Sequence, residues 1–143
     1  MKALLDTCII SHIYRAHRSE RLKHFLHSIG EENCFISVVT LGEIINGIHQ
    51  LDEGKKKKDL LVWGEQFESK YSDHLLPINS GVARVWGELT ARTKRIGKNI
   101  PVADGLIAAT ALYNGLHVIT ENVKDFEPTG VQVINPYINV TNQ

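Results

Sequence analysis

The chain has 143 residues, of which 16 are basic and 16 are acidic, so its formal net charge is zero. A chain of this length buries enough surface to fold without stabilising disulfides or metal ions, and we expect residues 1–143 to form one domain. A neutral chain holds a polyanion only through a local basic patch or metal ions, so the global charge neither indicates nor excludes a nucleic-acid partner.

Cysteine usage and hydropathy predict the compartment. Cys8 and Cys34 stand without a Cys-x-x-Cys pair or histidines at zinc-finger spacing, which predicts free thiols in a reducing environment. The longest uncharged apolar stretch, residues 105–113, is less than half the roughly 20 residues that a membrane span needs. We therefore expect a cytoplasmic protein without a membrane segment.

Short apolar runs alternate with helical periodicity along the chain. The runs predict strands at residues 3–5, 34–39, 75–78, 117–120 and 131–134. Between them, apolar residues recur at spacings of three and four, as in Leu41, Ile44, Ile45 and Ile48. Strands separated by helices predict an α/β fold, a three-layer α/β/α sandwich with a mainly parallel central sheet.

Asp6 follows the first predicted strand and precedes a helix that begins near Thr7. Ligands of open α/β sheets bind at the carboxyl ends of strands, which makes Asp6 a candidate ligand or catalytic group. An Asp at this junction can equally cap the helix by accepting backbone N–H bonds. Position alone leaves both roles open.

Glu43 lies just past the second predicted strand. Thr40 and Glu43 match a capping box, in which the glutamate reaches back to the N-cap amide. Leu41 and Ile44 also place Glu43 close to the apolar face of its helix, where a carboxylate needs a partner or a metal ion. The capping role and the ligand role are both open at this position.

The stretch 101–112, "PVADGLIAATAL", sets one carboxylate, Asp104, at the head of an apolar helix. The helix dipole stabilises an acid there by about 0.3 to 1 kcal/mol, so a structural role alone can explain Asp104. Three carboxylates at strand-helix junctions can converge, however, only around a positive charge. Mg²⁺ or Mn²⁺ fits, because these ions take oxygen ligands and activate water.

Two stretches are rich in basic residues. Residues 84–98 carry five basic side chains against one acid, immediately before Asp104, and Arg92 and Arg95 are candidate phosphate contacts there. A plain solvated helix face explains that stretch equally well. The lysine run at residues 55–58 is interpreted as a solvated helix start or loop.

Four segments together resemble the PIN-domain family, in particular the VapC-type toxins of bacterial toxin-antitoxin systems and the related FitB proteins. They are "LLDTCIIS", "ISVVTLGEIINGI", "IPVADGLIAATAL" and "GLHVITENVKDFEPTGVQVINP". The resemblance implies an Mg²⁺- or Mn²⁺-dependent endoribonuclease that cleaves RNA with metal-activated water. It also implies a homodimer inhibited by a cognate antitoxin, through which the protein would reach promoter DNA.

The resemblance extends to single residues. Asp6, Glu43 and Asp104 match the first three acids of the family, which implies that they hold the metal. Asn122 stands where related proteins often have an Asp, and Asp125 follows three residues later. Both are candidates for the fourth catalytic position.

Thr7 matches a small hydroxyl residue beside the first acid, and it is a candidate substrate contact together with Arg92 and Arg95. Two other functions compete with RNA cleavage. A FitB-like module can bind DNA with a partner and regulate transcription without cleavage. A metal-dependent phosphatase is disfavoured, because the chain has no signature of a phosphoaspartate route.

Overall fold

The computed structural model describes residues 1–14 and 20–138. Its centre is a five-stranded sheet of order β3-β2-β1-β4-β5 in which every pairing is parallel. The strands are β1 Ala3–Leu5, β2 Cys34–Ser37, β3 Leu75–Leu76, β4 His117–Ile119 and β5 Val133–Ile134. Each predicted strand is present, and the predicted parallel α/β/α sandwich is confirmed.

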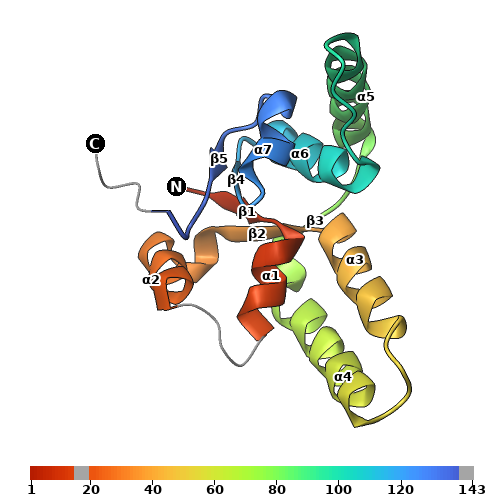
Figure 1. The fold of residues 1–143 in the computed structure, drawn as a ribbon. Helices are drawn as coiled ribbons and strands as arrows, with labels where there is room; N and C mark the ends of the chain where they lie inside the picture. The colour runs from red at the N-terminus through yellow and green to blue at the C-terminus, as the bar shows by residue number, and fades with distance from the viewer. Residues whose placement is uncertain (15–19, 139–143) are drawn as a thin grey trace.

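Helices cover both faces of the sheet. The α-helices are α1 Thr7–Tyr14, α2 Glu20–Ile29, α3 Val38–His49, α4 Lys55–Lys70, α5 Ser80–Arg95, α6 Val102–Asn114 and α7 Val123–Phe126. Short 3₁₀ helices follow at η1 Glu31–Asn33, η2 Ser72–His74 and η3 Glu127–Thr129. Figure 1 shows α1 to α4 on one side of the sheet and α5 to α7 on the other. None of the helices in the described ranges is long and apolar enough to cross a membrane.

Two apolar cores lie on the two faces, because successive strand residues point to opposite sides. Leu5 packs into the core under α1 to α4, whereas its neighbour Leu4 packs into the core under α5 to α7. Both side chains are buried. β1 is therefore apolar on both faces, as expected for a central parallel strand, and the chain turns polar only where β1 ends.

The start of α3 corrects one sequence prediction. Ser37 caps the helix, because its Oγ accepts a hydrogen bond from the Val39 amide at 3.0 Å, and β2 therefore ends two residues earlier than predicted. Thr40 lies in the first turn instead of at the cap. The predicted Thr40–Glu43 capping box is wrong, and Glu43 has no capping role there.

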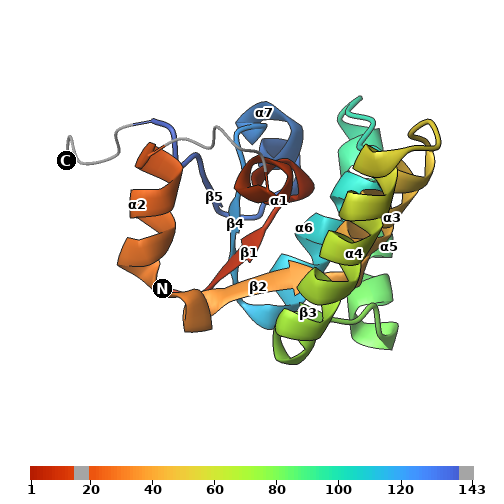
Figure 2. The ribbon, with the colours of Figure 1, turned by 90° about the horizontal axis from the view of Figure 1, so that it is seen from below.

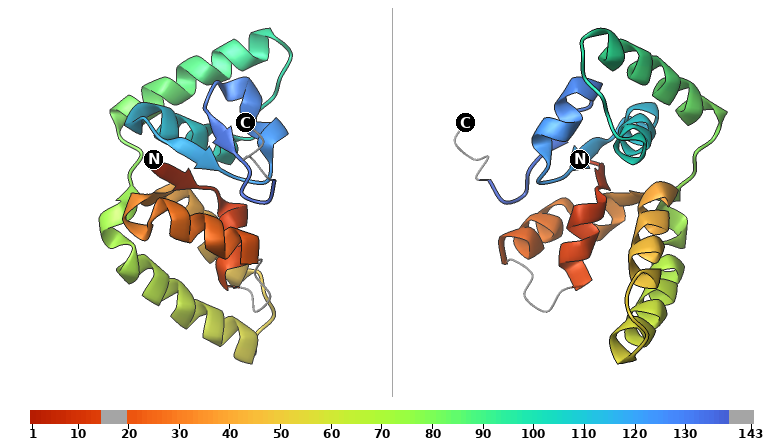
Figure 3. Two further views of the ribbon diagram at one scale, coloured as in Figure 1. Left: turned by 90° about the vertical axis from the view of Figure 1, so that its left-hand side faces the viewer. Right: turned by 45° about the vertical axis from the view of Figure 1, so that its right-hand side comes forward.

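The parallel sheet brings its strand ends to one edge, from which α1 and α3 depart. α6 runs back toward the opposite edge and ends at Gly115, whose φ of 68° is a left-handed conformation that glycine adopts without strain. The first turn of α6 is thereby left at the same edge as the ends of β1 and β4. Figures 2 and 3 show the α3–α4 and α5–α6 connections projecting on the side where α1 and α7 lie.

Candidate metal centre

Asp6 sits at the end of β1 with only 4 % of its surface exposed. Its Oδ1 accepts a hydrogen bond from the Thr7 amide at 2.8 Å, and its Oδ2 accepts one from the Thr120 hydroxyl at 2.7 Å. Thr120 is fully buried at the end of β4, the strand beside β1. Two neighbouring strand ends therefore fix this carboxylate.

Glu43 is joined to Asp6 through Thr7. The Thr7 hydroxyl donates to Glu43 Oε1 at 2.5 Å and lies 3.1 Å from the hydroxyl of buried Thr40. Glu43 itself is exposed, so the expectation that it lies close to the apolar core is wrong. The carboxylate is instead held toward the start of α1 by a hydroxyl.

Asp104 lies in the first turn of α6. Its pKa is raised to about 6, chiefly by burial and then by the charges of Asp6, Asp125 and Glu43, in that order of importance. In the described part of the chain, no group donates a hydrogen bond to its carboxylate. The carboxylates of Asp6, Glu43 and Asp125 therefore lie near enough to Asp104 for their negative charges to raise its pKa.

Asn122 and Asp125, the two candidates for the fourth catalytic position, both lie near these acids. The backbone N–H of Asn122 donates to Thr120 Oγ1 at 3.0 Å, which places the Asn122 backbone beside the hydroxyl that binds Asp6. Asp125 lies within α7, and its amide donates to the Asn122 carbonyl at 3.1 Å. The charge of Asp125 is one of those that raise the pKa of Asp104.

The donor set fits a hydrated hard cation. Within residues 1–14 and 20–138, no three His, Cys, Asp or Glu side chains are close enough to ligate one ion together. The charges of Asp6, Asp125 and Glu43 nevertheless all contribute to the raised pKa of Asp104. Mg²⁺ keeps several waters and binds through one or two carboxylates, so contact with three is not required.

Cys8 does not add a soft ligand to this set. Its sulfur lies 3.5 Å from Asp6 Oδ2 and from Thr120 Oγ1. Burial is the main cause that raises the pKa of the thiol to about 11, so the thiol is neutral at physiological pH. The sulfur therefore packs against the acid site as a weak hydrogen-bonding group.

Sequence reasoning missed the buried threonines that organise the acids. Thr40 and Thr120 are fully buried, and their hydroxyls contact Thr7 and Asp6 respectively. A hydroxyl at the end of an apolar strand, as in Thr120, is the sequence signal for such a contact, because a buried polar group needs a partner. The bond between His12 and Glu121 was also missed, since the two are 109 positions apart.

The basic stretches behave differently from each other. Arg92 donates from Nη2 to the Thr129 carbonyl at 2.6 Å and so ties α5 to η3, while Arg95 is exposed at the end of α5. In the lysine run, Lys55 pairs with Asp59 at 2.8 Å and Lys57 pairs with Glu53 at 2.6 Å. The predicted helix start at these lysines is confirmed.

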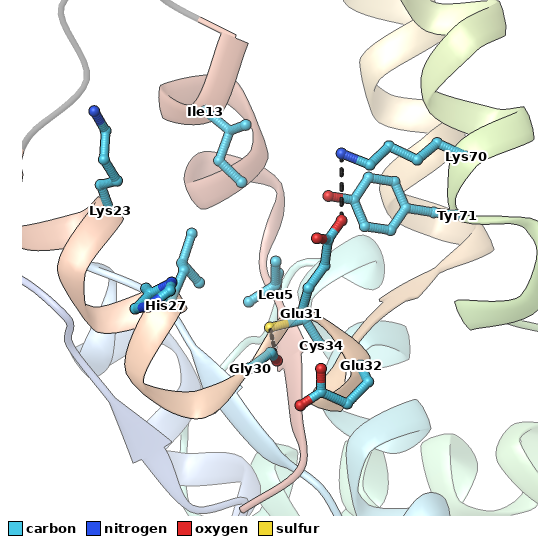
Figure 4. Close-up of a pocket in the computed structure, with 11 residues that line it drawn as sticks. Leu5, Ile13, Lys23, His27, Gly30, Glu31, Glu32, Cys34, Lys70 and Tyr71 are labelled. Carbon is cyan, nitrogen blue, oxygen red and sulfur yellow. Dashed lines mark hydrogen bonds and ion pairs between the residues drawn. The ribbon is translucent and has the colours of Figure 1, made fainter.

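A pocket of about 560 Å³ lies elsewhere, between α1, α2 and the end of α4 (Figure 4). Leu5, Ile13 and Leu26 contribute apolar surface to it, and Lys70 pairs with Glu31 at its rim at 3.3 Å. None of the converging acids lines it. The carboxylate chemistry and this pocket are separate places on the molecule.

The PIN domain family matches residues 3–129 of the chain, which span all strands of the parallel sheet but the last and all the acids described above. The chain belongs to this family. Toxin FitB of Neisseria gonorrhoeae is 35% identical over 138 residues, covering 94% of this chain and 97% of FitB. VapC ribonuclease Y4jK of Sinorhizobium fredii is 29% identical, covering 94% and 96%. A chain in the structure of FitAB bound to an IR36 DNA fragment superposes with a TM-score of 0.90 at 33% identity, covering 99% of each chain.

Proposed function

We propose that the protein is the toxin of a toxin-antitoxin pair, a divalent-metal-dependent endoribonuclease that hydrolyses RNA phosphodiester bonds. The observation that carries the proposal is the convergence of Asp6, Glu43 and Asp125 on Asp104. The name of toxin FitB supports the role as a toxin, and the name of VapC ribonuclease Y4jK supports RNA cleavage as the reaction class. We also propose that residues 1–143 act as one domain.

In the proposed mechanism, Asp6 and Asp104 would hold the Mg²⁺ or Mn²⁺ ion. When bound, the cation supplies positive charge to the phosphate and lowers the pKa of water. Glu43, oriented by Thr7, accepts the proton of the attacking water, and Asn122 and Asp125 are auxiliary groups at the same edge. Thr7 acts through Glu43, because its hydroxyl already donates to that carboxylate.

The end of α5 is the proposed contact for the RNA backbone. Arg95 is exposed there, and residues 96–101 connect it to the helix that carries Asp104. Arg92 retains further N–H donors beyond the one that binds Thr129. A phosphate on this surface would hold a strand across the acid site.

The proposed partner is a cognate antitoxin, through which the toxin reaches promoter DNA. Clustered carboxylates attract a guanidinium, which binds them with two parallel hydrogen bonds, so we expect an antitoxin Arg to block the cation site. The related FitAB complex was solved bound to a DNA fragment, which agrees with such an assembly. Exposed Ile96 and Val102 support a homodimer, and the free thiols support a cytoplasmic location.

The test is RNA cleavage by the purified, partner-free protein with Mg²⁺ or Mn²⁺. We expect cleavage that EDTA abolishes and that Asp104→Asn lacks. The alternative is a module that binds DNA with its partner and does not cleave RNA. If the folded protein leaves structured RNA intact with either metal, while the complex binds promoter DNA, that alternative is supported and the proposal is overturned.

A further inference from the structure

His12 on α1 and Glu121 after β4 form a contact that the proposed mechanism does not use. The His12 Nε2 lies 2.7 Å from Glu121 Oε1, and the two side chains are 27% and 40% exposed. Glu121 directly follows Thr120, whose hydroxyl binds Asp6. Successive Cα atoms are about 3.8 Å apart, so the Glu121 side chain starts within reach of the acid site.

α1 holds this segment with two side chains one turn apart. Cys8 contacts Thr120 at 3.5 Å, and His12 contacts Glu121; residues four apart share a helix face. The His12 ring also packs edge-on against Tyr137, with ring centroids 5.7 Å apart. The C-terminal segment therefore also contacts the imidazole.

Tyr137 is itself held in place. Its carbonyl accepts a hydrogen bond from Arg21 on α2 at 2.5 Å, and its amide donates to Asn135 Oδ1 at 2.9 Å. The bond between His12 and Glu121 thus belongs to a network that spans α1, α2 and the two segments after β4 and β5. A network of this kind fixes the direction of the Glu121 side chain.

The Glu121 carboxylate is held on α1 by its contact with His12. The carboxylates that act on Asp104 are those of Asp6, Asp125 and Glu43, and Glu121 is not one of them. Glu121 is nevertheless the residue between Thr120 and Asn122. The bond to His12 is the interaction that turns its carboxylate toward α1.

We propose that His12 is a positioning residue that holds Glu121 on α1 and so keeps a fifth carboxylate away from the cation site at Asp6 and Asp104. The inference rests on the metal chemistry proposed above. Since Mg²⁺ is six-coordinate, an extra carboxylate would occupy a position that a substrate phosphate needs. His12 thereby limits how tightly the protein alone holds the ion.

The experiment is calorimetric titration of Mn²⁺ and Mg²⁺ into the full chain and its variants. His12→Phe keeps an aromatic edge against Tyr137 and removes Nε2, and we expect Mn²⁺ to bind about fivefold tighter because a carboxylate is released. Adding Glu121→Gln to that variant returns the affinity to the wild-type value. Glu121→Gln alone, whose carbonyl still accepts from His12, binds as the wild type does. His24→Phe, at an exposed histidine on α2, is the matched control.

The outcomes test the role of His12, the role of Glu121 and the proposed metal chemistry separately. Unchanged or weaker Mn²⁺ binding by folded His12→Phe overturns the role of His12, and tighter binding that Glu121→Gln leaves in place overturns the role of Glu121. Failure of the wild type to bind either cation overturns the metal chemistry instead. If Phe does not fit against Tyr137, His12→Leu repeats the comparison, with circular dichroism confirming the fold.

Discussion

The end of β1 and the first turn of α6 each give one carboxylate to the same site, under opposite conditions. Asp6 is almost completely buried and accepts hydrogen bonds from Thr7 and Thr120. Asp104 is less buried, receives no hydrogen bond from the described residues, and has a pKa raised to about 6. The more buried acid is the better supplied with donors.

The difference shows that burial and electrostatic strain are separate quantities in this site. Hydrogen bonds to a buried carboxylate offset its lost hydration, whereas like charges without donors do not. Asp6 is therefore part of the fold as well as of the site, and Asp104 gains most from a bound cation. The two acids should respond with opposite signs when their charge is removed.

Asp6→Asn gives the largest expected effect, because it removes a ligand and disturbs a buried contact. An amide in place of Oδ2 faces the Thr120 hydroxyl donor, which leaves a buried polar group poorly paired. We expect the metal-free protein to lose about 1–3 kcal/mol of stability and RNA cleavage to disappear. Urea unfolding and a cleavage assay measure the two losses. Unchanged stability would mean that the hydrogen bonds to Asp6 contribute nothing to folding.

Asp104→Asn should abolish cation binding and lower cleavage at least 100-fold, since even outer partners of a metal contribute 10- to 100-fold. Unlike Asp6→Asn, it should stabilise the metal-free protein at pH 7.5, with a Tm higher by about 3 °C, because it removes repulsion. Thermal unfolding of the metal-free proteins measures whether the Tm rises or falls. A lower Tm would support the simple dipole role of Asp104 over its role as a ligand.

The pH dependence follows from the same carboxyl. Because the pKa of Asp104 is about 6 in the folded chain and lower when unfolded, the folded state binds more protons between pH 4 and 6. Its contribution to stability is thus present at acid pH and lost as the pH rises through 6. Cation affinity changes the other way, falling about tenfold per pH unit below 6, since the ligand must be deprotonated. Asp104→Asn should flatten the stability profile in this window.

The sequence predicted the strands and the position of Asp6 after β1 far better than it predicted the hydrogen bonds that hold the acids. Apolar runs bounded by breakers and the position of Asp6 after β1 are local properties, and both were readable. The Thr40 cap was wrong because Ser37, three residues earlier, supplies the capping oxygen. The contacts of Thr120 and His12 depend on chain segments more than 100 positions away, and no local pattern encodes such pairs.

Thr7→Val tests the link between the two regions, since Thr7 gives its amide to Asp6 and its hydroxyl to Glu43. Valine keeps the amide and the shape but removes the hydroxyl. We expect about tenfold slower cleavage with cation affinity nearly unchanged, because Glu43 loses its orientation. Thr7→Ser, which retains the hydroxyl, is the control. Equal losses in both variants would assign the effect to packing.

Asp125→Asn gives the smallest expected effect and probes how repulsion is shared around Asp104. The Asp125 side chain is exposed on α7, yet its charge is the second of the three that raise the pKa of Asp104. Removing it should lower that pKa and weaken cation affinity only severalfold, since water screens an exposed carboxylate. Glu127→Gln, an equal change of charge at an exposed position on η3, should leave both quantities unchanged. NMR titration of the Asp104 carboxyl and calorimetry with Mn²⁺ measure the two effects. If Asp125→Asn weakens binding as much as Asp104→Asn does, Asp125 is a primary ligand, and Asp104 is not the carboxylate on which cation binding chiefly depends.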